Sequence, residues 1–132
     1  EDDLRGFAGQ FEVQEIGYDP WQSQYLANNL TEDGLNLVEY RQTVQNMSEP
    51  MKELEARILA ETLFHEGDPV LTWMISNVVA HLDAKENIYP RKEFPENKID
   101  AVVAVIMALG LYLRKQEEIT PYAKHGLRVI DL

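Results

Sequence analysis

The chain has 132 residues, of which 45% are hydrophobic and 27% charged, and this is the composition of a single globular domain with its own core. The absence of cysteine excludes disulfides and thiolate metal sites, and the longest apolar run, at 101–113, is too short to cross a bilayer. The formal net charge of −11 argues against a stand-alone DNA-binding protein, because DNA affinity depends on basic side chains that neutralise phosphates.

The first third of the chain predicts a parallel β-α-β unit. After a short helix at 4–11, strands are expected at 12–18 and 35–40. Between them, Asp19 and Pro20 have the form of a helix start, with Asp as the N-cap and Pro as the first helical residue. Two strands joined by a helix indicate a right-handed crossover.

The rest of the chain predicts three helices and a loop. Helices are expected at 47–64, capped by Ser48, at 68–81 and at about 99–114. The proline-containing stretch at 84–98 predicts a loop, with one short extended piece as an alternative. A parallel sheet usually has more than two strands and cover on both faces. The pattern therefore predicts part of an α/β domain, with a short parallel sheet covered by helices.

Two aspartates are the strongest candidates for chemistry. Asp19 follows the first strand, and ligands of open α/β sheets gather at the carboxyl ends of strands. Its position before a proline is explained equally well by an N-cap. Asp100 opens the most apolar helix, where a carboxylate is costly unless it is paired or bound to metal. A solvent-facing place in the first helical turn explains it as well, so both alternatives stay open.

The other polar and aromatic residues have simpler structural interpretations. His65 and His81 do not have zinc-ligand spacing, and His65 is expected to interact with a helix C-terminus. The tryptophans and tyrosines are expected in the core or at its rim rather than as platforms for bases. Arg91, Lys92 and Lys98 form the basic cluster of interest, and a solvated loop is the alternative to DNA contact. The sequence shows no phosphate-binding glycine loop, so no ATPase is expected in this chain.

Four ordered blocks resemble the large terminase subunit of tailed bacteriophages and prophages. They are EIGYDPWQSQYLANNL at 15–30, VEYRQTVQNMSEPMKELE at 38–55, LFHEGDPVLTWMISNV at 63–78 and NKIDAVVAVIMALG at 97–110. The resemblance implies the C-terminal part of a nuclease domain with a partial RNase H-like fold. The activity it implies is endonuclease cutting of concatemeric double-stranded DNA during genome packaging.

The resemblance also implies a cofactor, site residues and partners. It gives Asp19 and Asp100 as catalytic metal ligands for two Mg²⁺ or Mn²⁺ ions, which prefer carboxylate oxygens. It makes Arg91, Lys92 and Lys98 the expected DNA contacts. Besides double-stranded DNA, the expected partners are the portal and the small terminase subunit. The expected location is the cytoplasm of a bacterial host, without a membrane contact.

One departure from the family pattern limits these expectations. The family's first catalytic aspartate lies on an upstream strand in a glycine-rich context, and nothing before Glu12 resembles it. Without that strand, the chain is expected to lack one metal ligand and to cut DNA poorly alone. The chain also starts at Glu1 rather than methionine, which predicts an excised or processed product. Two alternatives remain: a docking module of the packaging machinery, and a resolvase-type nuclease on the same fold.

Overall fold

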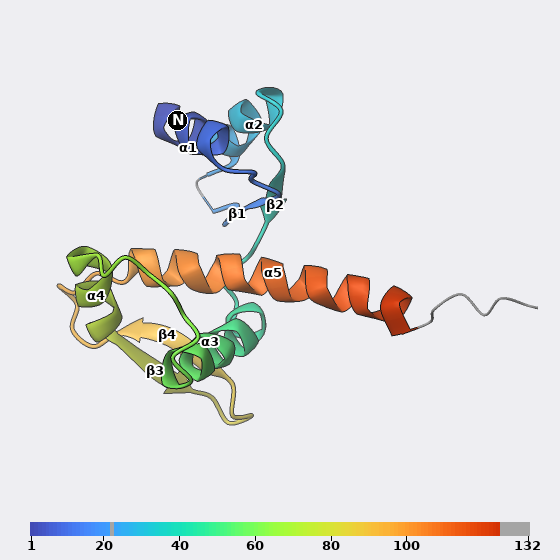
Figure 1. The fold of residues 1–132 in the computed structure, drawn as a ribbon. Helices are drawn as coiled ribbons and strands as arrows, with labels where there is room; N and C mark the ends of the chain where they lie inside the picture. The colour runs from blue at the N-terminus through green and yellow to red at the C-terminus, as the bar shows by residue number, and fades with distance from the viewer. Residues whose placement is uncertain (22, 125–132) are drawn as a thin grey trace, which may run out of the picture.

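The long C-terminal helix divides the molecule into two lobes. The structure, a computed structural model, describes residues 1–21 and 23–124, with side chains as far as Ile119. Helix α5 (Asp100–Lys124) runs between a smaller lobe formed by the first third of the chain and a larger lobe formed by the middle (Figure 1). The helix expected at about 99–114 thus continues to Lys124, and residues 125–132 lie outside the described residues.

The smaller lobe is the β-α-β unit that the sequence predicts. Strand β1 pairs in parallel with β2, so that Ile16 faces Leu37 and Tyr18 faces Glu39. This confirms the parallel pair, although each strand is only three residues long. The elements are α1 (Asp2–Gln10), β1 (Ile16–Tyr18), α2 (Gln24–Glu32) and β2 (Leu37–Glu39).

The larger lobe combines two helices with an antiparallel hairpin. Helix α3 packs against α5 and β4, and α4 packs against the start of α5. Within the hairpin, Val78 pairs with Lys92 and Leu82 with Ile88. The elements are α3 (Val44–Leu59), α4 (Pro69–Ser76), β3 (Val78–Leu82) and β4 (Ile88–Lys92). No helix in the described part of the chain is long and apolar enough to cross a membrane.

Helix α2 does not begin at Asp19, as the sequence predicts, but at Gln24, after Ser23 as the N-cap. The carboxylate of Asp19 accepts the backbone N–H groups of Trp21 at 2.9 Å and of Gln42 at 3.1 Å. It therefore closes a turn and reaches a second segment of the chain instead of capping a helix.

Asp68 does cap α4, because its Oδ1 accepts the N–H of Leu71 at 2.8 Å.

Helix α3 begins and ends earlier than the sequence predicts. Its N-cap is Thr43, whose hydroxyl accepts a backbone N–H of the first turn at 3.2 Å. Ser48 is buried inside the helix, and its hydroxyl accepts a backbone N–H from β4 at 3.1 Å. Glu61 adopts the left-handed conformation just beyond the helix end, with φ 55°, so the chain leaves the helix before the predicted end at 64.

The hairpin overturns one sequence prediction and refines another. The helix expected to continue to His81 ends at Ser76, and the extended piece within the loop at 84–98 is the paired strand β4. Val78 and Val79 are β-branched and pair well in a strand, where Pro90 opposes Ala80. A proline is tolerated there because, within the described residues, the sheet consists of β3 and β4 and leaves one edge of β4 unpaired.

The core is built along α5. Residues from the end of β2, from α3 and from α5 bury their side chains together, and this places α5 in contact with both lobes. The buried cluster consists of Tyr40, Met47, Leu54, Val102, Ile106, Met107 and Leu111.

Tyr40 packs on α5 at Gly110, the position at which the helix presents no side chain to it. A Cβ added to Gly110 would overlap the Tyr40 hydroxyl and lie 2.5 Å from its Cζ. The hydroxyl donates to the backbone carbonyl of Asn46 at 2.6 Å, and the Arg114 guanidinium lies 4.4 Å from the centre of the ring. Burial raises the pKa of the Tyr40 hydroxyl, and Arg114 opposes that rise. Gly110 therefore determines how closely the end of β2 approaches α5.

We predict that Gly110→Ala lowers the free energy of unfolding by about 1–3 kcal/mol, as expected for overpacking of a filled core. Gly6→Ala in α1 is the matched control, since an added Cβ there meets nothing within 4 Å. That control is expected to raise stability by about 0.4–1 kcal/mol, because alanine restricts the unfolded chain. Urea unfolding measures both changes. An equal stability of wild type and Gly110→Ala would contradict this account of the packing.

Candidate active site

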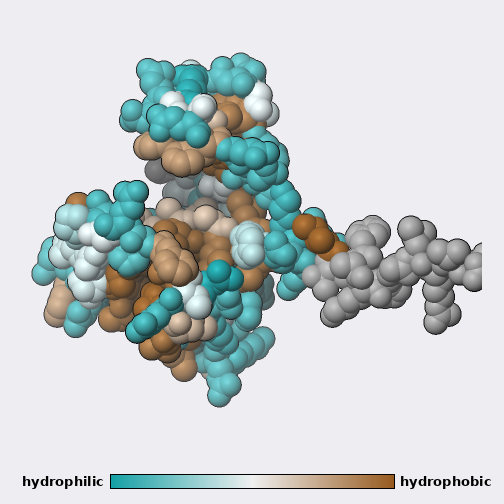
Figure 2. All heavy atoms as spheres, in the orientation of Figure 1, coloured by the Kyte–Doolittle hydropathy of each residue, from teal (hydrophilic) through white to brown (hydrophobic). Residues whose placement is uncertain are grey.

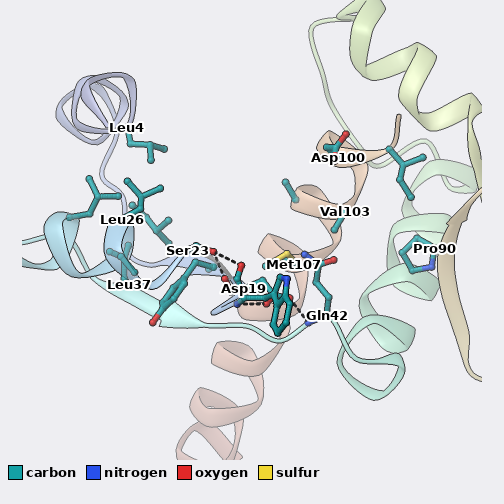
Figure 3. Close-up of a pocket in the computed structure, with 18 of the residues that line it drawn as sticks. Leu4, Asp19, Ser23, Leu26, Leu37, Gln42, Pro90, Asp100, Val103 and Met107 are labelled. Atoms are coloured by element: carbon teal, nitrogen blue, oxygen red, sulfur yellow. Dashed lines mark hydrogen bonds between the residues drawn. The ribbon is translucent and has the colours of Figure 1, made fainter. Parts of the chain in front are cut away.

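A cavity opens beside the N-terminal half of α5, between the two lobes. Its volume is about 670 Å³, and its walls come from the β1–β2 unit on one side and from β4 on the other, with α5 between them (Figure 3). Much of its lining is apolar and includes Leu26, Leu37 and Met107. Three charged side chains also line it: Asp19, Asp100 and Lys92.

Asp19 lies at the carboxyl end of β1 and is half-buried. Its Oδ1 holds the loop after β1 through Trp21, and its Oδ2 holds the loop after β2 through Gln42. The hydroxyl of Ser23 donates to its backbone carbonyl. These bonds fix the position of the carboxylate. Each carboxylate oxygen has more than one acceptor site, so both oxygens can still coordinate a cation.

Asp100 is the first residue of α5, and its side chain is exposed. Of the two alternatives that the sequence left open here, a costly buried carboxylate and a solvent-facing one, the structure has the second, and the residue buried here is the preceding Ile99, at 8% exposure. The first turn of the helix extends beyond the core, so the carboxylate keeps its water. In the first turn it also has a favourable interaction with the helix dipole. Asp100 nonetheless lines the same cavity as Asp19, across from it on α5 (Figure 3).

The three basic candidates are separated by the fold. Lys92, at the end of β4, lines the cavity and is exposed. Arg91 and Lys98 are also exposed, but they are not among the residues that line the cavity. Of this cluster, Lys92 is therefore the residue that shares the cavity with the two aspartates.

Asn77 supports the start of α5, and the sequence analysis did not single it out. It is only 7% exposed, and its side-chain amide donates to the backbone carbonyl of Lys98 at 3.0 Å. Its own backbone carbonyl accepts the N–H of Glu93 at 3.1 Å. Asn77 thus ties both ends of the 93–98 loop, which leads into Asp100. The available signal is an asparagine within the mostly apolar stretch WMISNVV at 73–79, although many asparagines in such stretches are exposed.

The two histidines within the described residues, His65 and His81, lie outside this site. His65 is exposed, and its Nδ1 accepts the N–H of Gly67 at 3.0 Å. Because α3 ends at Leu59, His65 does not lie at a helix C-terminus, so that prediction is wrong. His81 is exposed on β3 and does not line the cavity.

The oxygen-only donor set fits a hard divalent cation. Mg²⁺ is usually held by one or two carboxylates together with water, and neither sulfur nor imidazole is needed. Asp19 and Asp100 provide such carboxylates on the walls of one cavity. Among the described residues, no group of three or more His, Cys, Asp or Glu side chains is arranged to hold a metal ion. The two aspartates are therefore an incomplete set for a pair of metal ions.

Comparison with known proteins decides the family. Residues 4–117 match the family described as "Terminase large subunit, endonuclease domain". The chain belongs to this family. This confirms the resemblance seen in the four sequence blocks, and it favours a terminase over a resolvase-type nuclease.

Two relatives and one solved structure agree with this assignment. Protein YmfN of Escherichia coli strain K12 is 42% identical over 110 residues, which cover 82% of this chain and 24% of YmfN. The terminase large subunit of Enterobacteria phage HK97 is 29% identical over 110 residues, covering 82% of this chain and 22% of that protein. The crystal structure of the HK97 bacteriophage large terminase has a TM-score of 0.74 and 28% identity over 83% of this chain and 23% of that chain.

This chain thus has the α/β fold of the matching part of the HK97 large terminase, and it spans about a quarter of the length of these relatives.

We predict that the two aspartates differ in their effect on stability. Asp19→Ala leaves two backbone N–H groups without their acceptor, and hydrogen bonds to charged groups contribute about 1.5–3 kcal/mol each, less where water replaces them. Asp100→Ala removes only an exposed charge at a helix start, so its effect is expected to be smaller. Urea unfolding at neutral pH compares them. A larger loss for Asp100→Ala than for Asp19→Ala would contradict these roles.

Proposed function

We propose that this chain forms part of a metal-dependent endonuclease that cuts concatemeric double-stranded DNA during phage genome packaging. In this proposal Asp19 and Asp100 are ligands of Mg²⁺ or Mn²⁺ in an RNase H-like domain. The observation that carries it is that both aspartates, from segments far apart in the sequence, line one cavity. Membership in the terminase endonuclease family supports the same chemistry.

The chain's own residues contribute position and charge. Bound divalent ions supply an activated water and stabilise the leaving oxygen of a phosphodiester. The two backbone N–H groups hold the Asp19 carboxylate in place, and the support of Asn77 places the first turn of α5, which carries Asp100. Lys92 is available to neutralise a phosphate on the opposite wall. Because two carboxylates hold a metal pair poorly, the proposal includes a further ligand from another part of the protein.

This arrangement reconciles the acidic chain with a DNA substrate. The net charge of −11 opposes binding to phosphates over the surface as a whole. At the cavity, bound divalent ions would invert the local charge, since such ions are often the largest charges in a site. Arg91 and Lys98 would then contact the DNA backbone outside the cavity. The proposal places the protein in the host cytoplasm, with the portal and the small terminase subunit as partners.

A docking module is the second candidate function, and exposed apolar side chains favour it. Phe64 is 91% exposed, and Leu59 and Trp73 are also exposed. Figure 2 shows hydrophobic surface on the larger lobe, in the region of α3 and α4. Surfaces of this kind mark contacts with other proteins when they are contiguous. Docking through this lobe leaves the cavity open, so the two functions are compatible.

Plasmid cleavage with Mn²⁺ tests the nuclease proposal. In a protein of the relatives' length that contains these residues, Asp100→Ala is expected to reduce cleavage by at least about 100-fold, because a misplaced metal loses most of its transition-state stabilisation. Glu55→Gln removes an exposed charge from α3 and is the matched control, with cleavage unchanged. The 132-residue chain alone is expected to cut weakly. Undiminished cleavage by the Asp100→Ala protein would remove Asp100 from the site and favour the docking function.

A further inference from the structure

Trp21 is exposed at the edge of the candidate site. Its side chain is 80% exposed, although the sequence predicts a place in the core or at its rim. Its backbone is held firmly, because its N–H donates to Asp19 Oδ1 at 2.9 Å. The same residue lines the cavity with Asp19, Asp100 and Lys92. The backbone of Trp21 is therefore held next to the candidate metal ligands, while its indole ring is open to solvent over most of its surface.

An indole in this position contributes little to the core. Tryptophan is highly buried on average, and its large apolar surface stabilises a protein mainly when it is covered. The DPW turn keeps the ring in water while its backbone is tied to a carboxylate that is expected to bind metal. A ligand with an aromatic face would cover the ring, and a nucleic acid held at the metal site offers such faces.

We propose that Trp21 stacks on an unpaired base of the DNA strand held in the cavity, one side of the strand meeting the indole and the other meeting Lys92. This inference rests on the proposed nuclease function. Stacking of a base on an aromatic ring is tolerant of sequence, because every base has a π-face. In an intact duplex both faces of a base are covered by its neighbours. On a double-stranded substrate, Trp21 can therefore stack only where a base is locally unstacked, and free single strands are expected to reach it more easily than a continuous duplex.

Tyr25 separates the effect of position from that of exposure. It lies on α2, four residues beyond Trp21, and is 78% exposed. It is not among the residues that line the cavity. If exposure alone brought aromatic rings into contact with DNA, the two residues would behave alike. The proposal expects a contact from Trp21 and none from Tyr25.

Tryptophan fluorescence tests the contact directly, because the chain has only two tryptophans. Trp73→Phe leaves Trp21 as the reporter, and Trp21→Phe leaves Trp73, on α4, as the matched control. Each 132-residue protein is titrated at low ionic strength, in Mg²⁺, with a single-stranded oligonucleotide and with a duplex of the same sequence. Anisotropy of dye-labelled DNA measures binding independently. The expected result is quenching of Trp21 by the single strand, weaker quenching by the duplex, and no change at Trp73.

Affinity provides the second measurement. Trp21→Ala is expected to weaken binding of the single strand by about 5- to 150-fold, the range for the loss of one base–aromatic stack. Tyr25→Ala is expected to leave it unchanged. Melting temperatures verify that both proteins remain folded, and the exposure of both side chains favours this.

Each contrary outcome has a distinct meaning. DNA that binds while Trp21 emission and affinity stay unchanged overturns the inference, assigns the indole to a protein contact and leaves the nuclease proposal intact. Equal quenching by single strand and duplex overturns the preference for an unpaired base. Failure of any DNA to bind the 132-residue protein overturns the inference for this chain, and the nuclease proposal is then decided by the plasmid cleavage of the longer protein.

Discussion

The close packing of Tyr40 on Gly110 sets the distance between the β1–β2 unit and α5, and the other features of the site depend on it. The tyrosine ring occupies the space that a side chain at Gly110 would fill. Gly17 plays the same part on β1, where an added Cβ would lie 2.8 Å from Leu111 Cδ1. With the strands held this close to the helix, the end of β1 faces the first turns of α5. Asp19 and Asp100 consequently line one cavity.

Most of the helix–strand order was predictable, because the parallel unit and the start of α5 have clear local patterns. The β3–β4 hairpin was not predictable in the same way. Val70, Trp73, Met74 and Val78 fall at helical spacing across an element boundary, and Pro90 argues locally against a strand. The partner strand supplies the missing stabilisation, and pairing of that kind leaves no signal in a short sequence window.

The candidate site shows the same division between local and long-range information. Sequence position and family resemblance singled out Asp19 and Asp100, and the fold brings both to one cavity. The bond from Asp19 to Gln42 spans 23 residues, so no local pattern distinguishes it from a helix cap. The exposure of Asp100 and Trp21 likewise depends on where the core ends. Solvent exposure at the edge of a core is a tertiary property.

The most direct measurement is the broadening of amide NMR signals of the 132-residue chain by substoichiometric Mn²⁺. If Asp19 and Asp100 belong to one cation site, signals around both residues broaden together. In that case Asp19→Asn removes the broadening around Asp100 as well, because one ion causes both effects. Broadening around only one of the two, or broadening at Asp100 that survives Asp19→Asn, would contradict a shared metal site and with it the central claim.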